Sequence, residues 1–128
     1  MKIKILGAGV ARLATAVALK QKDFDVEVYE RHKSRSHLGA GIVCWPNASF
    51  VLDKLGIIDD ISNQSGQPVR MRRLTKDGDD LGVLDILKLN KKMNYSSFSI
   101  LRKDLMKILE SHLNQWGLTL STGKQSKN

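Results

Sequence analysis

The glycines that follow the first apolar segment constrain the fold of this chain more than any other feature. Residues 2–6 (Lys-Ile-Lys-Ile-Leu) predict a strand that ends at Gly7, and residues 10–20 have the alanine-rich pattern of a helix. Residues 26–29 (Val-Glu-Val-Tyr) predict a second strand, which ends at Glu30. A strand, a glycine turn, a helix and another strand within about thirty residues form a right-handed βαβ unit. The sequence therefore predicts an α/β, Rossmann-like fold.

The glycine turn has the residue types of a phosphate-binding loop. Gly7 is suited to a tight turn, and Gly9 leaves room for the backbone to approach a pyrophosphate. The predicted helix begins near Val10, so its free N–H groups and the positive end of its dipole are directed at the same place. Such a glycine pattern is a weak signal alone, but its position between a strand and a helix favours a nucleotide site.

Glu30 is a candidate ligand for the ribose of such a nucleotide. It ends the second predicted strand, where dinucleotide sites place a carboxylate that accepts hydrogen bonds from a ribose hydroxyl. The same carboxylate would repel a 2′-phosphate, which favours FAD or NAD over NADP, although Arg31 and Lys33 weaken this preference. The alternative, a surface residue at a strand end, is less favoured in a βαβ context.

Arg12 departs from the usual pattern, in which a third glycine lets the helix lie close to the strand. An arginine stem at this position is expected to push the helix and strand apart, or to turn outward. We favour the interpretation that Arg12 weakens cofactor binding, since close packing is hard to replace. The opposing interpretation is that its guanidinium reaches a phosphate through a charge-assisted hydrogen bond.

The rest of the chain predicts further elements in a single domain. Pro46 and the residues after it predict a helix over 46–55, which Gly56 would end. Two strands joined by an Asp-Gly turn predict an antiparallel hairpin over 69–87. Apolar residues at helical spacing predict a helix over 101–113, followed by Gly117 and a short strand at 118–120. Residues 121–128 are expected to form a polar tail.

Composition excludes several classes of protein. The chain has 128 residues, of which 41% are apolar and 27% are charged, as in one globular domain or part of a larger one. Cys44 is the single cysteine, so no internal disulfide forms and a reducing cytoplasm is expected. We interpret it as a small buried hydrophobe and not as a nucleophile. No metal site is expected, because no pair of ligands has the required spacing among His32, His37 and His112.

The net charge of +8 could favour nucleic acid, anionic lipid or a phosphate-bearing ligand. The basic residues are spread along the chain in small clusters, which is typical of a solvated surface. Few aromatic residues accompany them, so no nucleic-acid partner is expected. No apolar segment approaches the length of a membrane span.

Several motifs occur in an order that resembles the FAD-dependent aromatic hydroxylases, the single-component flavoprotein monooxygenases. The resemblance is carried by Gly7-Ala8-Gly9-Val10-x-x-Leu13, by Val26-Glu27-Val28-Tyr29-Glu30-Arg31, by Leu38-Gly39-Ala40-Gly41-Ile42 with Pro46-Asn47-Ala48, and by Leu101-Arg102-x-x-Leu105-x-x-x-Leu109. It covers only the N-terminal portion of that family. Two later segments of the family do not occur in this sequence, an Asp-Gly segment that contacts both cofactors and a Gly-Asp segment that binds the ribityl and pyrophosphate of FAD. Residues 1–120 would then be a partial FAD-binding domain that includes the hairpin.

The resemblance also implies roles for individual residues. Residues around Val10 would line the pyrophosphate, Glu30 would hold the adenosine ribose, and Arg31 would lie near the same end of FAD. Val43 falls where the family contacts the cofactor, and Arg102 matches the arginine that reaches towards the flavin. A cation at a helix start opposes the dipole, which independently favours an anionic or carbonyl-bearing partner for Arg102. The alternative is that Arg102 is a solvated arginine at a helix end with no role in binding.

The resemblance implies an oxidoreductase in which NADH or NADPH reduces FAD and an aromatic substrate is hydroxylated. No side chain is an obvious general acid or base, so no catalytic residue is assigned. We expect the FAD-binding portion of such a monooxygenase, incomplete as a catalyst and able to take an aromatic substrate only if the remaining regions complete it. The alternative is a non-catalytic FAD- or NAD-binding module, or one subunit of a split oxidoreductase. Exposed sheet edges would then favour a homo-oligomer or a complementary chain.

Overall fold

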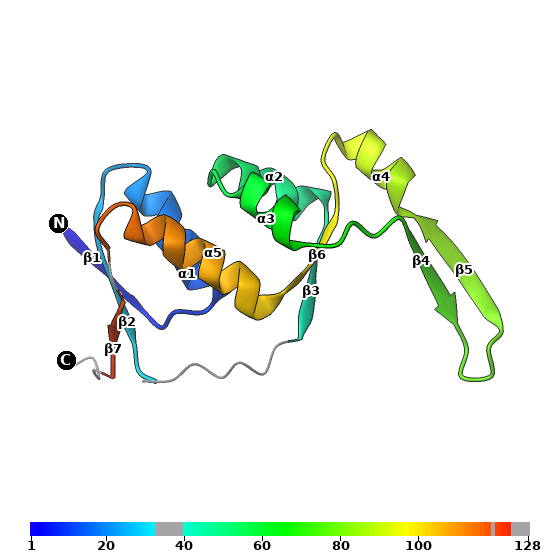
Figure 1. The fold of residues 1–128 in the computed structure, drawn as a ribbon, viewed down its shortest axis with the longest axis horizontal. Helices are drawn as coiled ribbons and strands as arrows, with labels where there is room; N and C mark the ends of the chain where they lie inside the picture. Colours follow the sequence, from blue (N-terminus) through cyan, green and yellow to red (C-terminus); the bar gives the residue numbers. More distant parts are fainter. Residues whose placement is uncertain (33–39, 119, 124–128) are drawn as a thin grey trace. The chain divides into compact units, whose positions relative to one another are not determined.

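The computed structural model describes residues 1–32, 40–118 and 120–123 (Figure 1). Its residues fall into two compact units. The first comprises Met1–Ala40 and Leu101–Asn128, and the second comprises Gly41–Ile100. Both units combine helices with strands, so the predicted α/β fold class is confirmed.

The first unit contains the predicted βαβ arrangement. Strand β1 (Lys2–Leu6) leads through the glycine turn to helix α1 (Val10–Lys20), and strand β2 (Asp25–Glu30) lies parallel to β1. A short strand, β7 (Ser121–Thr122), adds to the other edge of β2. The parallel sheet therefore has the order β1-β2-β7, with β2 at its centre.

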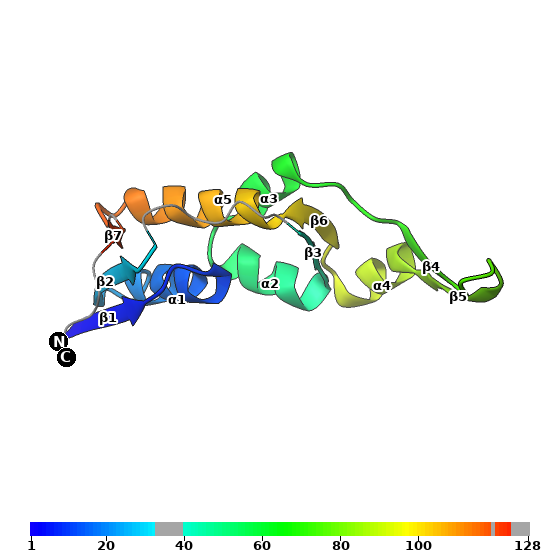
Figure 2. The same cartoon turned by 90° about the horizontal axis from the view of Figure 1, so that it is seen from below.

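The apolar core of this unit lies on the helical side of the sheet. Val26 and Val28 of β2 are buried, and α1 packs against their strand. Helix α5 (Arg102–Asn114) lies along α1, as Figures 1 and 2 show. The buried side chains of the two helices recur at helical spacing and are Leu13, Ala16 and Val17 in α1, with Leu105, Ile108, Leu109 and Leu113 in α5.

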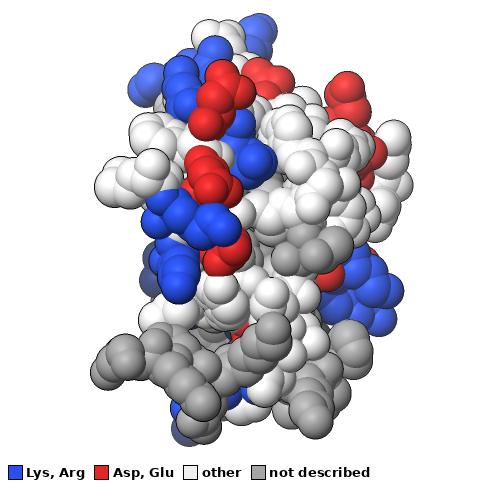
Figure 3. All heavy atoms as spheres, turned by 90° about the vertical axis from the view of Figure 1, so that its left-hand side faces the viewer, with Lys and Arg blue, Asp and Glu red and all other residues white. Residues whose placement is uncertain are grey.

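The opposite face of the sheet is polar. Strand residues alternate between faces, so Lys2 and Lys4 share a side with Glu27 and Tyr29. The Lys2 ammonium lies 2.7 Å from a Glu27 carboxylate oxygen, and the Tyr29 hydroxyl donates to the same carboxylate. These bonds lower the pKa of Glu27 and raise the pKa of Tyr29. Figure 3 shows charged side chains of both signs interspersed on this side of the molecule.

The second unit begins with strand β3 (Gly41–Cys44), which pairs with β6 (Phe98–Leu101). Helices α2 (Pro46–Lys54) and α3 (Ile58–Gln64) follow β3 and pack against each other. The core side chains here are Cys44, Leu52, Leu55, Ile57, Ile61, Ile86, Phe98 and Ile100.

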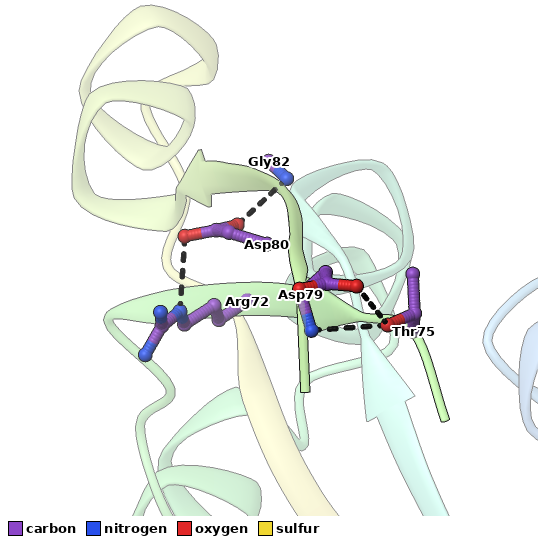
Figure 4. Close-up of polar contacts among 5 residues, drawn as sticks. All are labelled: Arg72, Thr75, Asp79, Asp80 and Gly82. Carbon is purple, nitrogen blue, oxygen red and sulfur yellow. Dashed lines mark hydrogen bonds and ion pairs between the residues drawn. The ribbon is translucent and has the colours of Figure 1, made fainter. Parts of the chain in front are cut away.

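The predicted hairpin is confirmed as β4 (Arg70–Leu74) and β5 (Asp80–Asp85), which are antiparallel. Figure 4 shows the contacts at its closed end. The Arg72 Nε lies 3.2 Å from Asp80 Oδ2, and the Asp79 amide donates to the Thr75 hydroxyl over 3.0 Å. Gly78 takes the left-handed φ of 92° that the Asp-Gly turn requires. Both strands are exposed along their length.

Three predicted boundaries were wrong. The hairpin ends at Asp85 and not at residue 87, because the Asp85 carboxylate accepts the Lys88 amide (3.1 Å) and caps helix α4 (Ile86–Met93). On sequence alone, Gly39 and Gly41 together with Ile42 favour a shaped turn beside the cofactor, but residues 41–44 form a strand. Gly39 itself lies outside the described residues. The last strand begins at Ser121, within the segment expected to be a polar tail.

Other local predictions were correct. Gly56 and Gly117 follow α2 and α5 with left-handed φ values of 79° and 70°, as helix-terminating glycines do.

In the part of the chain that the structure describes, no helix combines the length and apolar character of a membrane span.

We predict that Leu109→Ala destabilises the first unit by about 2–5 kcal/mol, because Leu109 is fully buried and its loss leaves a cavity. Urea denaturation followed by circular dichroism measures the change. Leu87→Ala is the control, since Leu87 is 58% exposed in α4, and we expect it to cost less than about 0.5 kcal/mol. Equal effects of the two substitutions would contradict the proposed core.

Candidate functional site

The turn between β1 and α1 brings backbone donors to one place. Gly7 adopts φ of 93°, and its amide donates to the carbonyl of Tyr29 over 2.6 Å, which joins the turn to β2. Gly9 is the N-cap of α1, and its carbonyl accepts the first helical bond from Leu13 (2.9 Å). The helix therefore starts at Val10, as predicted, with its free N–H groups at this turn.

Glu30 is held against the same turn. One carboxylate oxygen accepts a hydrogen bond from the Ala8 amide (2.9 Å), and the other accepts one from the His32 amide (3.0 Å). A carboxylate has about four acceptor sites, so capacity for further donors remains. The structure thus brings together Gly7, Gly9, Val10 and Glu30 within the first unit. Sequence reasoning placed Glu30 near the turn but missed its direct bond to Ala8.

The backbone at Gly9 can be approached closely. A Cβ added there would have no described atom within 4 Å beyond its immediate chain neighbours. This open space is what a loop needs if a pyrophosphate is to contact its amides. The two glycines differ in this respect, because a Cβ on Gly7 would meet the Arg12 side chain.

Arg12 does not force α1 away from the sheet, so the expected loss of close packing was wrong. The helix still buries Leu13, Ala16 and Val17 completely. The arginine remains exposed, and its Cδ and guanidinium lie beside Gly7.

The remaining candidates are Arg31, Arg102 and Val43. Arg31 is exposed directly after β2. Arg102 is exposed at the first position of α5, and its amide donates to the carbonyl of Ala40 (3.2 Å). Val43 lies on β3 in the second unit with 41% of its surface exposed. These positions supply an exposed cation after β2, an exposed cation at the start of α5 and an exposed apolar side chain on β3.

Cys44 has the environment of a structural residue. It is buried in β3, and burial raises the pKa of its thiol, which keeps the thiol protonated at neutral pH. Among the described residues, no cluster of three or more His, Cys, Asp or Glu side chains could hold a metal ion.

We predict that Glu30→Gln destabilises the first unit by about 1–3 kcal/mol. The two carboxylate oxygens of Glu30 accept two backbone N–H groups, whereas a glutamine side chain has only one acceptor oxygen for them. Asp25→Asn is the control, since it also replaces a carboxylate by an amide but at the exposed start of the same strand. It should cost less than about 0.5 kcal/mol. Urea midpoints of the two variants measure the difference. A Glu30→Gln variant as stable as Asp25→Asn would show that these bonds do not hold the turn.

Comparison with known proteins identifies relatives of this chain. No model of a protein family matches the chain. The FAD-dependent urate hydroxylase of Klebsiella pneumoniae is 32% identical over 119 residues, which cover 91% of this chain and 30% of that protein. The 6-hydroxynicotinate 3-monooxygenase of Pseudomonas fluorescens is 42% identical over 67 residues, covering 52% of this chain and 17% of that protein.

Solved structures agree with these relatives. The structure of Klebsiella pneumoniae HpxO complexed with FAD and uric acid matches with a TM-score of 0.78 and 31% identity over 98% of this chain. A tetrameric form of 2-methyl-3-hydroxypyridine-5-carboxylic acid oxygenase matches with a TM-score of 0.83 and 26% identity, again over 98% of this chain. The chain spans about a third of the length of these proteins.

Proposed function

This chain is homologous to the N-terminal FAD-binding portion of the FAD-dependent monooxygenases, and we propose that it binds FAD at the turn between β1 and α1. The observation that carries the proposal is the contact between the glycine turn and Glu30, made by the Ala8 amide. It places backbone donors and a carboxylate side by side, which is the pairing that an adenine dinucleotide requires. A relative at 31% identity holds FAD in its structure.

The residues at the turn fit the adenosine and pyrophosphate part of FAD. Gly9 offers open backbone, and Val10 begins the helix whose N–H groups face the phosphates. Gly7 makes the tight turn, and Glu30 accepts bonds from the ribose hydroxyls. Arg31 adds positive charge near the same end of the cofactor.

Two further residues are assigned to the flavin half of FAD. Arg102 begins α5 without a side-chain cap on that helix, so its guanidinium is suited to a carbonyl or anionic group of the ligand. Val43 offers an exposed apolar side chain on β3. These two assignments rest on the sequence resemblance, together with the exposure of both side chains.

The proposed activity of the whole protein is hydroxylation of an aromatic substrate, with NADH or NADPH as reductant. FAD supplies the redox chemistry when bound, whereas the protein binds it, orients it and excludes water. No residue of this chain is assigned to proton transfer. We propose that residues outside this chain complete the substrate site and that the protein acts in the cytoplasm, where a single reduced cysteine is stable.

The exposed hairpin supports a partner for this chain, either a second copy or a complementary chain. Apolar side chains on β4 and β5 that are more than a third exposed are Met71, Leu74, Leu81, Val83 and Leu84. Two strands with no further partner are only marginally stable in water. We propose that this surface is covered in the functional assembly, either by a second copy or by a complementary chain.

We predict that FAD titrated into the 128-residue chain binds saturably, as measured by flavin fluorescence. Gly9→Ala and Gly9→Val should weaken binding progressively, by about tenfold or more for valine, because the side chain fills the space that the pyrophosphate needs. Gly66→Ala is the control, since a Cβ there makes ordinary contact with the Ser99 carbonyl oxygen at 4.0 Å. Saturable binding that is insensitive to Gly9→Val would place the cofactor elsewhere.

We also predict that the chain with FAD, oxygen, NADH or NADPH and an aromatic substrate produces no hydroxylated product. Product formation is measured by mass spectrometry together with nicotinamide oxidation. Coupled hydroxylation would show that this portion is a complete catalyst. Activity that appears only after a second polypeptide is added would support the split-oxidoreductase alternative.

A further inference from the structure

Arg12 stands where the phosphate-binding pattern usually has its third glycine, and the structure lays its side chain back along the turn. A Cβ placed on Gly7 would lie 3.1 Å from Arg12 Nη1, 3.2 Å from its Cδ and 3.3 Å from its Cζ. The guanidinium therefore covers the first glycine. Arg12 is exposed, so its side chain is accessible to solvent beside the turn.

The same side chain leaves the second glycine accessible. Apart from the immediate chain neighbours of Gly9, no described atom lies within 4 Å of the position that a Cβ would take there. The atoms of Arg12 are therefore also more than 4 Å from this position. The guanidinium therefore lies beside Gly7 and does not block the backbone at Gly9. The placement therefore favours contact with such a ligand over obstruction of it.

Charge at the turn also favours an anion. Arg12 lies in the first turn of α1, where a cation is repelled by the positive end of the helix dipole. The first turn of α1 has no acidic residue. Glu30 brings one carboxylate to the turn from β2, where its two oxygens accept the Ala8 and His32 amides. A phosphate group at the turn would relieve this repulsion and would accept charge-assisted hydrogen bonds from the guanidinium.

We propose that Arg12 is a phosphate-binding residue that supplies, through charge, part of the affinity for the pyrophosphate of FAD. The inference rests on the proposed function, because it requires FAD to occupy the β1–α1 turn. It reverses the preference that the sequence suggested, in which an arginine at this position weakens binding. The reason is structural. With Arg12 beside Gly7, the apolar residues of α1 remain buried, whereas the preference assumed that this packing is lost.

The test compares FAD, ADP and adenosine as ligands of the full chain and its variants at low and high salt. Arg12→Gln and Arg12→Gly should weaken FAD and ADP by about tenfold and leave adenosine unchanged, because adenosine lacks the phosphates. Arg12→Lys should retain part of the affinity, and the salt dependence of FAD binding should be shallower in Arg12→Gln than in the parent chain. Lys22→Gln, which removes one positive charge from an exposed turn after α1, should leave all three affinities unchanged.

The outcomes separate this proposal from the proposed function. If Arg12→Gly binds FAD as tightly as the parent chain, or more tightly, the proposed role of Arg12 is wrong. The same conclusion holds if Arg12→Gly binds FAD and the parent chain does not. An equal loss of adenosine affinity would mean that the arginine contacts the base or ribose, which also contradicts the proposal. If the parent chain and every variant keep their circular dichroism spectra and none binds FAD, the proposed function fails together with this inference.

Discussion

The hydrogen bond from the Ala8 amide to the Glu30 carboxylate joins the turn between β1 and α1 to the carboxyl end of β2. The glycine turn leaves β1, Glu30 ends β2, and α1 starts within two residues of the amide donor. A second bond, from the Gly7 amide to the Tyr29 carbonyl, holds the same two segments. The position of the helix N-terminus, and with it the direction of its free N–H groups, depends on this pair of contacts.

Elements with a strong local signal were predicted well. Helix α1 and its flanking strands lie at the expected residues because alternation, helical periodicity and the glycine turn all indicate the same arrangement. The proximity of Glu30 to the turn follows from parallel strands whose carboxyl ends meet at one edge. The bond from Glu30 to Ala8 could not be predicted, since it depends on a side-chain conformation that the pattern leaves open.

Short elements were missed for a different reason. Strands β3 and β6 have four residues each, and their stability comes from pairing between segments far apart in the chain. Helix α3 has seven residues, which provide too little periodicity for a prediction. Helix α4 did have a local signal, because Asp85 stands three residues before Lys88 as an N-cap, but the alternating apolar residues before it favoured a longer strand.

The polar face of the first sheet determines what kind of surface can pack on it. Lys2 and Glu27 bond to each other there, and the Lys4 ammonium lies 6.0 Å from the centre of the Tyr29 ring. An apolar layer placed over this face would have to remove water from an ammonium group and a carboxylate together, at a desolvation cost that their mutual attraction does not recover. Any protein segment that settles on this side of β1 and β2 must therefore bring hydrogen-bonding groups of its own or leave water in between.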